Sequence, residues 1–298
     1  MADWESGGLP PVARARIDRA ASSDVRTSLL SASEMVTVGD AGFEPVGEVM
    51  GVVVSHLGFG GYGCGVWSGW GNQWSPATTV TSSGGGYGGY APYVNALYAG
   101  YDGALRRCLL EAQALGADGV VGVRWTHDVL DDVGSREFVA MGTAVRARST
   151  SRPAHLFATD LPGQDLAKLM HSGWVPSGLV TGIAVAIRHD DYYTRQQARS
   201  WTGGNYEVQG YTELVTYVRA DARHQFAQRA ARHGGDSAIV SSMSLSVWEI
   251  EPADNHRDHI AQSIVVGTPI AKVAARGTRT ARPLTVLPLT GTRGRSSR

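Results

Sequence analysis

One segment of this chain occurs twice, and this duplication limits what the chain can fold into. The segment "GFEPVGEVMGVVV" (42–54) aligns without gaps on "GWVPSGLVTGIAV" (173–185), with Gly51 on Gly182. Later landmarks follow in the same order in both copies, at offsets that drift as expected when only loop lengths differ. Self-similarity of this kind indicates a structural unit made twice. We therefore expect two similar halves rather than one unrelated globule.

Each copy is predicted to contain a short helix, a strand, a loop, a long helix and two further strands. Apolar residues in the long helical segments recur at steps of three and four, which places them on one face of a helix. In the first copy this stripe is Val94, Leu97, Tyr101, Leu105, Cys108, Ala112 and Leu115, and in the second it is Val215, Ala222, Phe226 and Ala230.

A shared motif joins each long helix to the next strand, in "LGADGVVGV" (115–123) and "HGGDSAIVS" (233–241). Gly116 and Gly234 supply a residue that leaves the helix at positive φ without a Cβ clash. Asp118 and Asp236 are expected to accept hydrogen bonds from nearby backbone N–H groups in the tight turn. These four residues are predicted structural joints.

The predicted fold class is α+β, with two tandem repeats. Each repeat is expected to be a three-stranded antiparallel sheet with one long helix on it, plus a short N-terminal helix. The predicted boundaries are an N-terminal extension (1–24), repeat 1 (25–150) with a glycine-rich, aromatic insert (58–92), repeat 2 (151–273) and a basic flexible tail (274–298).

A thin sheet with one covering helix leaves its second face and both edges open, and open edges invite pairing with other chains. The strands carry apolar residues on both faces, for example at Val120 and Val121, which predicts cover on both sides. Self-association into a homo-oligomer is the strongest physical expectation from the sequence.

At these residues the sequence resembles the YbjQ-like heavy-metal-binding family. The resemblance rests on "GFEPVGEVMG", "EAQALGADGVVGV" and the terminal "GTAV", and covers 25–148 well and 155–273 more weakly. It implies a dodecin-like β-α-β-β subunit that assembles into a ring, with pentamers familiar in the family. A pentamer or decamer of this chain is the resulting expectation.

The residue types that soft metals prefer, thiolate and imidazole, nominate His56, Cys64 and His127 as metal ligands. A divalent or soft metal ion is the cofactor that they would hold. Cys108 lies on the helical stripe, where a free cysteine usually fills space. The segment "DNHRDH" (254–259) is interpreted as a solvated turn.

Two inserts at equivalent places combine glycine with aromatic rings, which can stack against partners or flat ligands. Charge is nearly absent from the first insert, which favours a mobile loop. Candidate contacts to a partner or ligand are Trp67, Trp70, Trp74, Tyr87 and Tyr90 in or beside the first insert, and Trp201 and Tyr206 in the second.

No catalytic constellation is recognisable. "GFGGYG" (58–63) has dinucleotide-binding spacing but lacks a following helix whose N-terminus could bind the phosphates. The 27 basic and 27 acidic residues balance, so nucleic acid is not an expected partner, and no apolar run reaches the ~18 residues of a membrane span. A cytoplasmic protein is the expectation, and the basic tail or the inserts could bind another protein.

Two functions follow from these patterns. The first is a non-enzymatic, homo-oligomeric assembly, ring-like or shell-like, that acts as a scaffold or binds partners. The alternative is a protein that binds a metal or an aromatic small molecule between its subunits.

Overall fold

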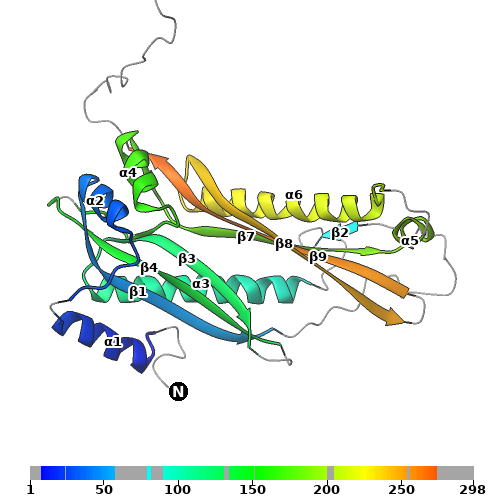
Figure 1. Ribbon diagram of the computed structural model, residues 1–298, viewed down its shortest axis with the longest axis horizontal. Helices are drawn as coiled ribbons and strands as arrows, with labels where there is room; N and C mark the ends of the chain where they lie inside the picture. The colour runs from blue at the N-terminus through cyan, green and yellow to red at the C-terminus, as the bar shows by residue number, and fades with distance from the viewer. Residues whose placement is uncertain are drawn as a thin grey trace, which may run out of the picture.

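The computed structural model describes residues 8–23, 25–57, 79–81, 90–130, 134–150, 152–199, 205–253 and 256–273. The fold is α+β, and its two halves repeat the same order of a short helix, a strand, a long helix and two strands (Figure 1). Cys64, Trp67, Trp70, Trp74, Tyr87 and Trp201 lie outside the described residues.

The first half is built on a four-stranded sheet with the strand order β1-β4-β3-β5. Long helix α3 packs on β1 and β4, and α1 and α2 flank the sheet (Figure 1). The bounds are α1 (Pro11–Ser22), α2 (Ala32–Asp40), β1 (Phe43–His56), α3 (Ala91–Ala114), β3 (Gly119–Val129), β4 (Ser135–Ala147) and β5 (Phe157–Ala158).

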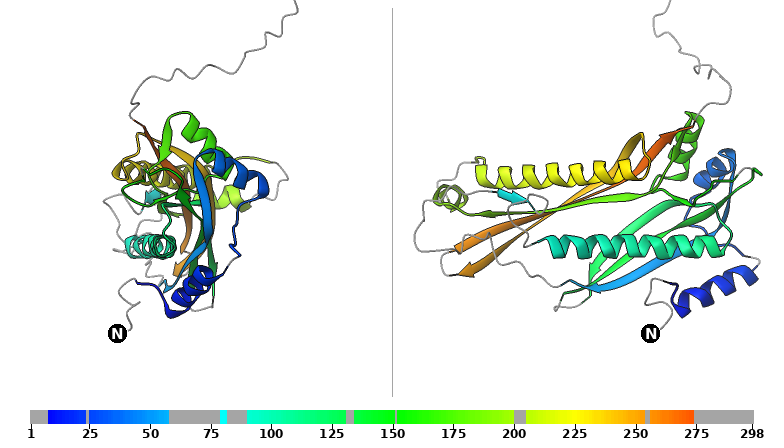
Figure 2. Two further views of the ribbon diagram at one scale, coloured as in Figure 1. Left: turned by 90° about the vertical axis from the view of Figure 1, so that its left-hand side faces the viewer. Right: turned by 180° about the vertical axis from the view of Figure 1, so that it is seen from behind.

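The second half is built on a five-stranded sheet in which β2, β7, β9 and β6 follow one another and β8 also pairs with β9. Long helix α6 packs on β7 and β9 (Figure 2). The bounds are β2 (Thr79–Thr81), α4 (Gly163–His171), β6 (Trp174–Pro176), β7 (Val180–His189), α5 (Tyr192–Arg199), α6 (Gln209–Arg232), β8 (Ser237–Ala253) and β9 (His256–Lys272).

The expectation of two three-stranded sheets is corrected by the added strands. The three central strands of each half, β1-β4-β3 and β7-β9-β8, are antiparallel as expected. However, β5 adds a parallel strand to β3, and β2 and β6 extend the second sheet. These additions are two or three residues long, which is too short for a hydrophobic period to reveal.

One glycine in each half lets the long helix lie directly on the first strand. A Cβ added to Gly51 would lie 1.9 Å from the carbonyl oxygen of Ala104 in α3. A Cβ added to Gly182 would lie 2.3 Å from the carbonyl oxygen of Ala222 in α6. No real Cβ tolerates such distances, so helix and strand meet backbone to backbone at the same place in both halves.

The helix-to-strand joints are also made alike. Gly116 and Gly234 have φ of 71° and 72°. The Oδ2 atoms of Asp118 and Asp236 accept hydrogen bonds from the backbone N–H groups of Ala147 (2.8 Å) and Lys272 (2.9 Å). The aspartates therefore tie the helix end to the last strand of each half rather than to the turn itself.

The largest core cluster crosses from one half to the other. It combines α3 side chains such as Leu97 with the first sheet, and it also contains Ile183 of β7 and Ile264 of β9. A separate cluster lies under α6, where Leu214 and Val218 are buried. Val215, which was assigned to the helical stripe, is only partly buried, so the stripe is shifted by one residue at that end of α6.

Candidate functional site

The contact between the two halves is a site that the duplicated fold adds to the single unit. The chain between them, here called the linker arm (residues 157–167), lies along the outer edge of β3. The N–H of Thr159 donates to the carbonyl of Val120 (3.0 Å), and the N–H of Val123 donates to the carbonyl of Thr159 (3.0 Å). The edge that β3 would otherwise leave open is thereby paired.

Apolar side chains of the linker arm are buried in the same contact. Phe157 and Leu166 join a cluster with Val38 of α2 and Val121 of β3. Leu166 is fully buried, and α4, which carries it, packs against α2. The second half thus covers the edge strand and the short helix of the first.

Helix α3 contributes the other side of the contact. The Tyr98 hydroxyl lies 2.8 Å from the backbone nitrogen of Ile183 and 3.2 Å from its carbonyl oxygen, on the edge of β7. Arg229 of α6 binds both carboxylate oxygens of Asp102 at 2.7 and 2.8 Å and lies over the Tyr98 ring. These polar contacts fix the register of α3 on the second half.

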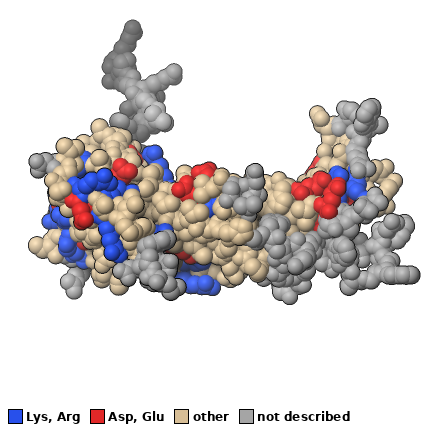
Figure 3. Space-filling model, turned by 90° about the horizontal axis from the view of Figure 1, so that it is seen from below, with Lys and Arg blue, Asp and Glu red and all other residues tan. Residues whose placement is uncertain are grey.

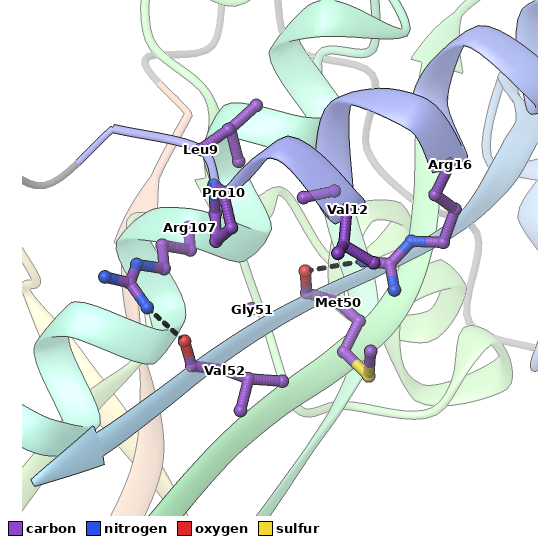
Figure 4. Close-up of a pocket in the computed structure, with 9 residues that line it drawn as sticks. Leu9, Pro10, Val12, Arg16, Met50, Gly51, Val52 and Arg107 are labelled. Carbon is purple, nitrogen blue, oxygen red and sulfur yellow. Dashed lines mark hydrogen bonds between the residues drawn. The ribbon is translucent and has the colours of Figure 1, made fainter. Parts of the chain in front are cut away.

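At the edge of β1, α1 takes the place that α3 takes at β7. Arg16 of α1 donates to the carbonyl of Met50 and pairs with Glu111 of α3, and Arg107 donates to the carbonyl of Val52 (Figure 4). Glu111 is 1% exposed, and burial raises its pKa although Arg16 and the N–H of Met50 act against the rise. The shallow pocket between α1 and β1 is lined by Leu9, Pro10, Val12, Ala13, Arg16, Met50, Gly51, Val52 and Arg107.

A network of acids and imidazoles joins β7 and β9 at the far end of the second sheet. His189 lies 3.1 Å from Asp258, and His259 lies 3.0 Å from Asp190. Tyr211 of α6 also donates to Asp190, and burial together with that carboxylate raises the pKa of Tyr211 to about 12. Acidic side chains gather toward this end in Figure 3, whereas basic ones gather at the end that carries α1.

This network corrects the interpretation of "DNHRDH" as a solvated turn. Strand β9 begins at His256, and Asp258 is fully buried. The sequence signal that could have revealed it is the pair of acid–imidazole neighbours, His189–Asp190 and Asp258–His259, which an antiparallel ladder brings face to face.

Comparison with known proteins places the chain in a family. The model described as "Putative heavy-metal-binding" (YbjQ_1) matches residues 77–148. The chain is 31% identical over 305 residues to the encapsulin nanocompartment protein Rv1762c of Mycobacterium tuberculosis, a match that covers 96% of this chain and 99% of the relative. The chain contains a YbjQ/UPF0145 domain and belongs to the same family as this mycobacterial protein.

A second relative is a UPF0145 protein of Halorubrum lacusprofundi. It is 53% identical over 47 residues, which cover 16% of this chain and 44% of the relative. No solved structure matches the chain significantly. The YbjQ family model covers part of the first half, whereas the mycobacterial relative spans both halves of this chain.

Two of the three predicted metal ligands, His56 and His127, lie in the described part of the chain. His56 is exposed at the end of β1, and His127 lies half-buried on β3. The Nδ1 atom of His127 lies 3.1 Å from the Tyr101 hydroxyl, and its Nε2 atom lies 3.4 Å from a nitrogen of Arg136. Burial and Arg136 lower the pKa of His127. Both ring nitrogens are therefore engaged by protein groups.

No metal-binding cluster is apparent in the part of the chain that the structure describes: it holds no group of three or more His, Cys, Asp or Glu residues suited to a metal ion. Because Cys64 lies outside that part, the metal site at His56, Cys64 and His127 stays a prediction. Cys108 is fully buried against the first sheet, and burial raises the pKa of its thiol to about 12. Its thiol therefore stays protonated.

Among the aromatic candidates, the structure describes Tyr90 and Tyr206. Tyr90 belongs to the main core cluster and is 3% exposed, so little of its side chain is accessible to a partner. Tyr206 is 47% exposed, and its hydroxyl donates to the carbonyl of Gln197 in α5. None of the described helices is long and apolar enough to cross a membrane.

Proposed function

We propose that the protein is a non-enzymatic structural component of an encapsulin nanocompartment, where it acts as a homo-oligomeric scaffold. The observation that carries this proposal is the 31% identity to an encapsulin nanocompartment protein over 99% of that relative's length. A match that spans both halves supports a shared arrangement of the whole tandem chain, rather than of one borrowed unit.

The fold supports an assembly role because it buries surface between repeated units. One core cluster already unites the two halves, and the linker arm covers the edge strand of the first. Edge strand β8 of the second half pairs only with β9 among the described strands. A unit of this kind stabilises its open edge by meeting another unit.

The proposal is tested on the native particle. Cells that produce the protein are lysed gently, the lysate is fractionated on a density gradient, and the fractions are probed with an antibody and imaged by negative-stain electron microscopy. We expect the protein in fractions that contain compartment-sized shells, and as an oligomer when it is purified alone. Recovery of the protein only as a free 31.6 kDa chain, away from every shell fraction, would overturn the proposal.

A further inference from the structure

The contact between the two halves consists of two parts, an arm and an edge, and the chain contains each part twice. The linker arm (residues 157–167) pairs with β3, with Phe157 opposite Gly119 and Ala158 opposite Val120. This contact is inside the chain and uses one copy of the arm and one copy of the edge.

The second copy of the arm leads into α2 and includes the first turn of that helix. Helices α2 (Ala32–Asp40) and α4 (Gly163–His171) occupy the same position in their repeats, so residues 26–36, here called the N-terminal arm, correspond to the linker arm. In each arm, one side-chain hydroxyl lies within hydrogen-bond distance of a threonine hydroxyl at the same position of the arm's own sheet. Ser28 lies 3.3 Å from Thr143, and Thr159 lies 2.8 Å from Thr268.

The N-terminal arm exposes the groups that the linker arm buries. Leu166 is fully buried, whereas Met35 at the corresponding position is 43% exposed. Ala167 is 5% exposed, whereas the corresponding Val36 is 65% exposed. Arg26 and Thr27, which correspond to the two residues of β5, are exposed as well. The arm is anchored at its own sheet, but its outer surface has no cover within the described chain.

The second copy of the edge is β8. It corresponds to β3, with Ser237 in the place of Gly119, and it has a bulge in the same region, between Val240 and Ser242 in β8 and between Val121 and Arg124 in β3. Val120 and Val121 are fully buried, whereas the corresponding Ala238 and Ile239 are only partly buried. Ser237 is exposed, and Val240, which follows Ile239, is 50% exposed. The structure describes no strand on the outer side of β8.

The residue on the edge and the residue on the arm are both replaced in the second copy, and the two replacements are compatible with each other. A Cβ on Gly119 would lie 2.4 Å from the Phe157 ring, so that pairing requires glycine under the ring. In β8 the corresponding residue is Ser237, and in the N-terminal arm the residue in place of phenylalanine is Arg26. An arginine side chain accommodates a serine that a packed ring would not.

We propose that the N-terminal arm of one copy adds a parallel strand to β8 of a second copy, with Arg26 opposite Ser237 and Thr27 opposite Ala238. Met35 of the arm then packs over β8, as Leu166 does over β3. This inference specifies the contact behind the proposed scaffold function and rests on it. Because the two surfaces differ, the contact is head-to-tail and generates a ring where its rotation closes.

Cross-linking tests the register directly in the full chain. Paired strands lie about 4.8 Å apart, which suits a disulfide between Cβ-bearing partners. Under mild oxidation, the double variant Thr27→Cys/Ala238→Cys should give a ladder of reducible multimers on non-reducing gels. The matched control Thr27→Cys/Val247→Cys places the second thiol farther along the same strand and should give no ladder. Equal cross-linking in both variants, or none in the first, would overturn the proposal.

Point charges provide a second, independent test. Val240→Asp should weaken association at least tenfold, as measured by mass photometry across a dilution series. Val247→Asp changes a residue of equal exposure (49% against 50%) on the same strand and should leave association unchanged. Met35→Asp should act like Val240→Asp, with Val129→Asp as its control. Thermal melting identifies any variant that fails to fold. Such a variant is set aside, and the cross-linking of Thr27→Cys/Ala238→Cys then tests the contact.

The outcomes separate this inference from the proposed function. If the wild-type chain assembles and cofractionates with shells while Val240→Asp and Met35→Asp change nothing, the arm-and-edge contact is wrong and the scaffold function stands. If the wild-type chain neither assembles nor cofractionates, the proposed function falls and takes this contact with it.

Discussion

Helices α3 and α6 are the same element made twice, and they differ most where they meet something other than their own sheet. Each has 24 residues, and each places a small residue, Ala104 or Ala222, over the glycine of the first strand. Seven residues farther on, about two helical turns, α3 has Glu111 and α6 has Arg229. Glu111 pairs with Arg16 of α1, whereas Arg229 pairs with Asp102 of α3. The residues on the helix face that packs on the sheet are therefore similar in both halves, whereas those on the other face differ with the segment that each helix contacts.

The largest expected effect tests the face that the two helices share. Gly51→Ala and Gly182→Ala should each lower the free energy of unfolding by about 3 kcal/mol, because the new Cβ meets helix backbone that cannot move aside. Gly39→Ala, in α2 with its nearest contact at 3.5 Å, is the matched control and should change stability by less than about 1 kcal/mol. Urea denaturation measures all three variants. A nearly unchanged Gly51→Ala variant would contradict the close approach.

The next effect sharpens the difference between the helices. Arg16→Ala leaves the buried Glu111 carboxylate without its charged partner, with the N–H of Met50 still bound to it, and should cost about 2 kcal/mol. Arg229→Ala removes an ion pair with Asp102, whose side chain is 49% exposed, and should cost about 1 kcal/mol or less. Urea midpoints of both variants measure the contrast. Equal losses would mean that the pair at α1 is no more buried than the pair at α6.

The loss of stability in Arg16→Ala is also expected to depend on pH. Because burial raises the pKa of Glu111, the folded chain binds more protons than the unfolded chain between the ordinary pKa and the raised one, so the stability from this group falls as pH rises through that range. Arg16→Ala removes a group that lowers this pKa and widens the range. Its loss of stability should therefore be larger at pH 8 than at pH 5, as read from urea midpoints. A loss independent of pH would refute the assignment.

The smallest effect compares the two joints. Asp118 is 8% exposed and also pairs with Arg152 at 3.1 Å, whereas Asp236 is exposed. Asp118→Ala should cost about 1.5 kcal/mol and Asp236→Ala about 0.5 kcal/mol, because water can replace the lost acceptor only at the exposed joint. Thermal unfolding followed by circular dichroism measures both. A larger loss at Asp236 would reverse the expected order.

The repeated elements were predictable because they rest on patterns within a few turns or strands. Steps of three and four located α3, and the glycine–aspartate motif located both joints. In α6 the same reasoning selected Val215, whereas Leu214 and Val218 are buried, since two adjacent apolar residues leave the phase of the helix undecided.

Contacts between distant segments were not predictable. Strand β5 has two residues and no period of its own, and it is defined by β3 and by the burial of Phe157. Tyr90 lies beside a glycine-rich insert, so its sequence context predicts a surface position, but its side chain is buried in the main core cluster. The network of His189, Asp190, Asp258 and His259 became visible once the register of β7 and β9 was known.

The covalent link between the halves also sets a rule of parity. If whole chains close a ring through the proposed head-to-tail contact, the ring always holds an even number of repeat units, so a ring of five units cannot form without leaving one half unpaired. Five chains would instead make a circle of ten units in which every second contact is tethered and every other one is free to open.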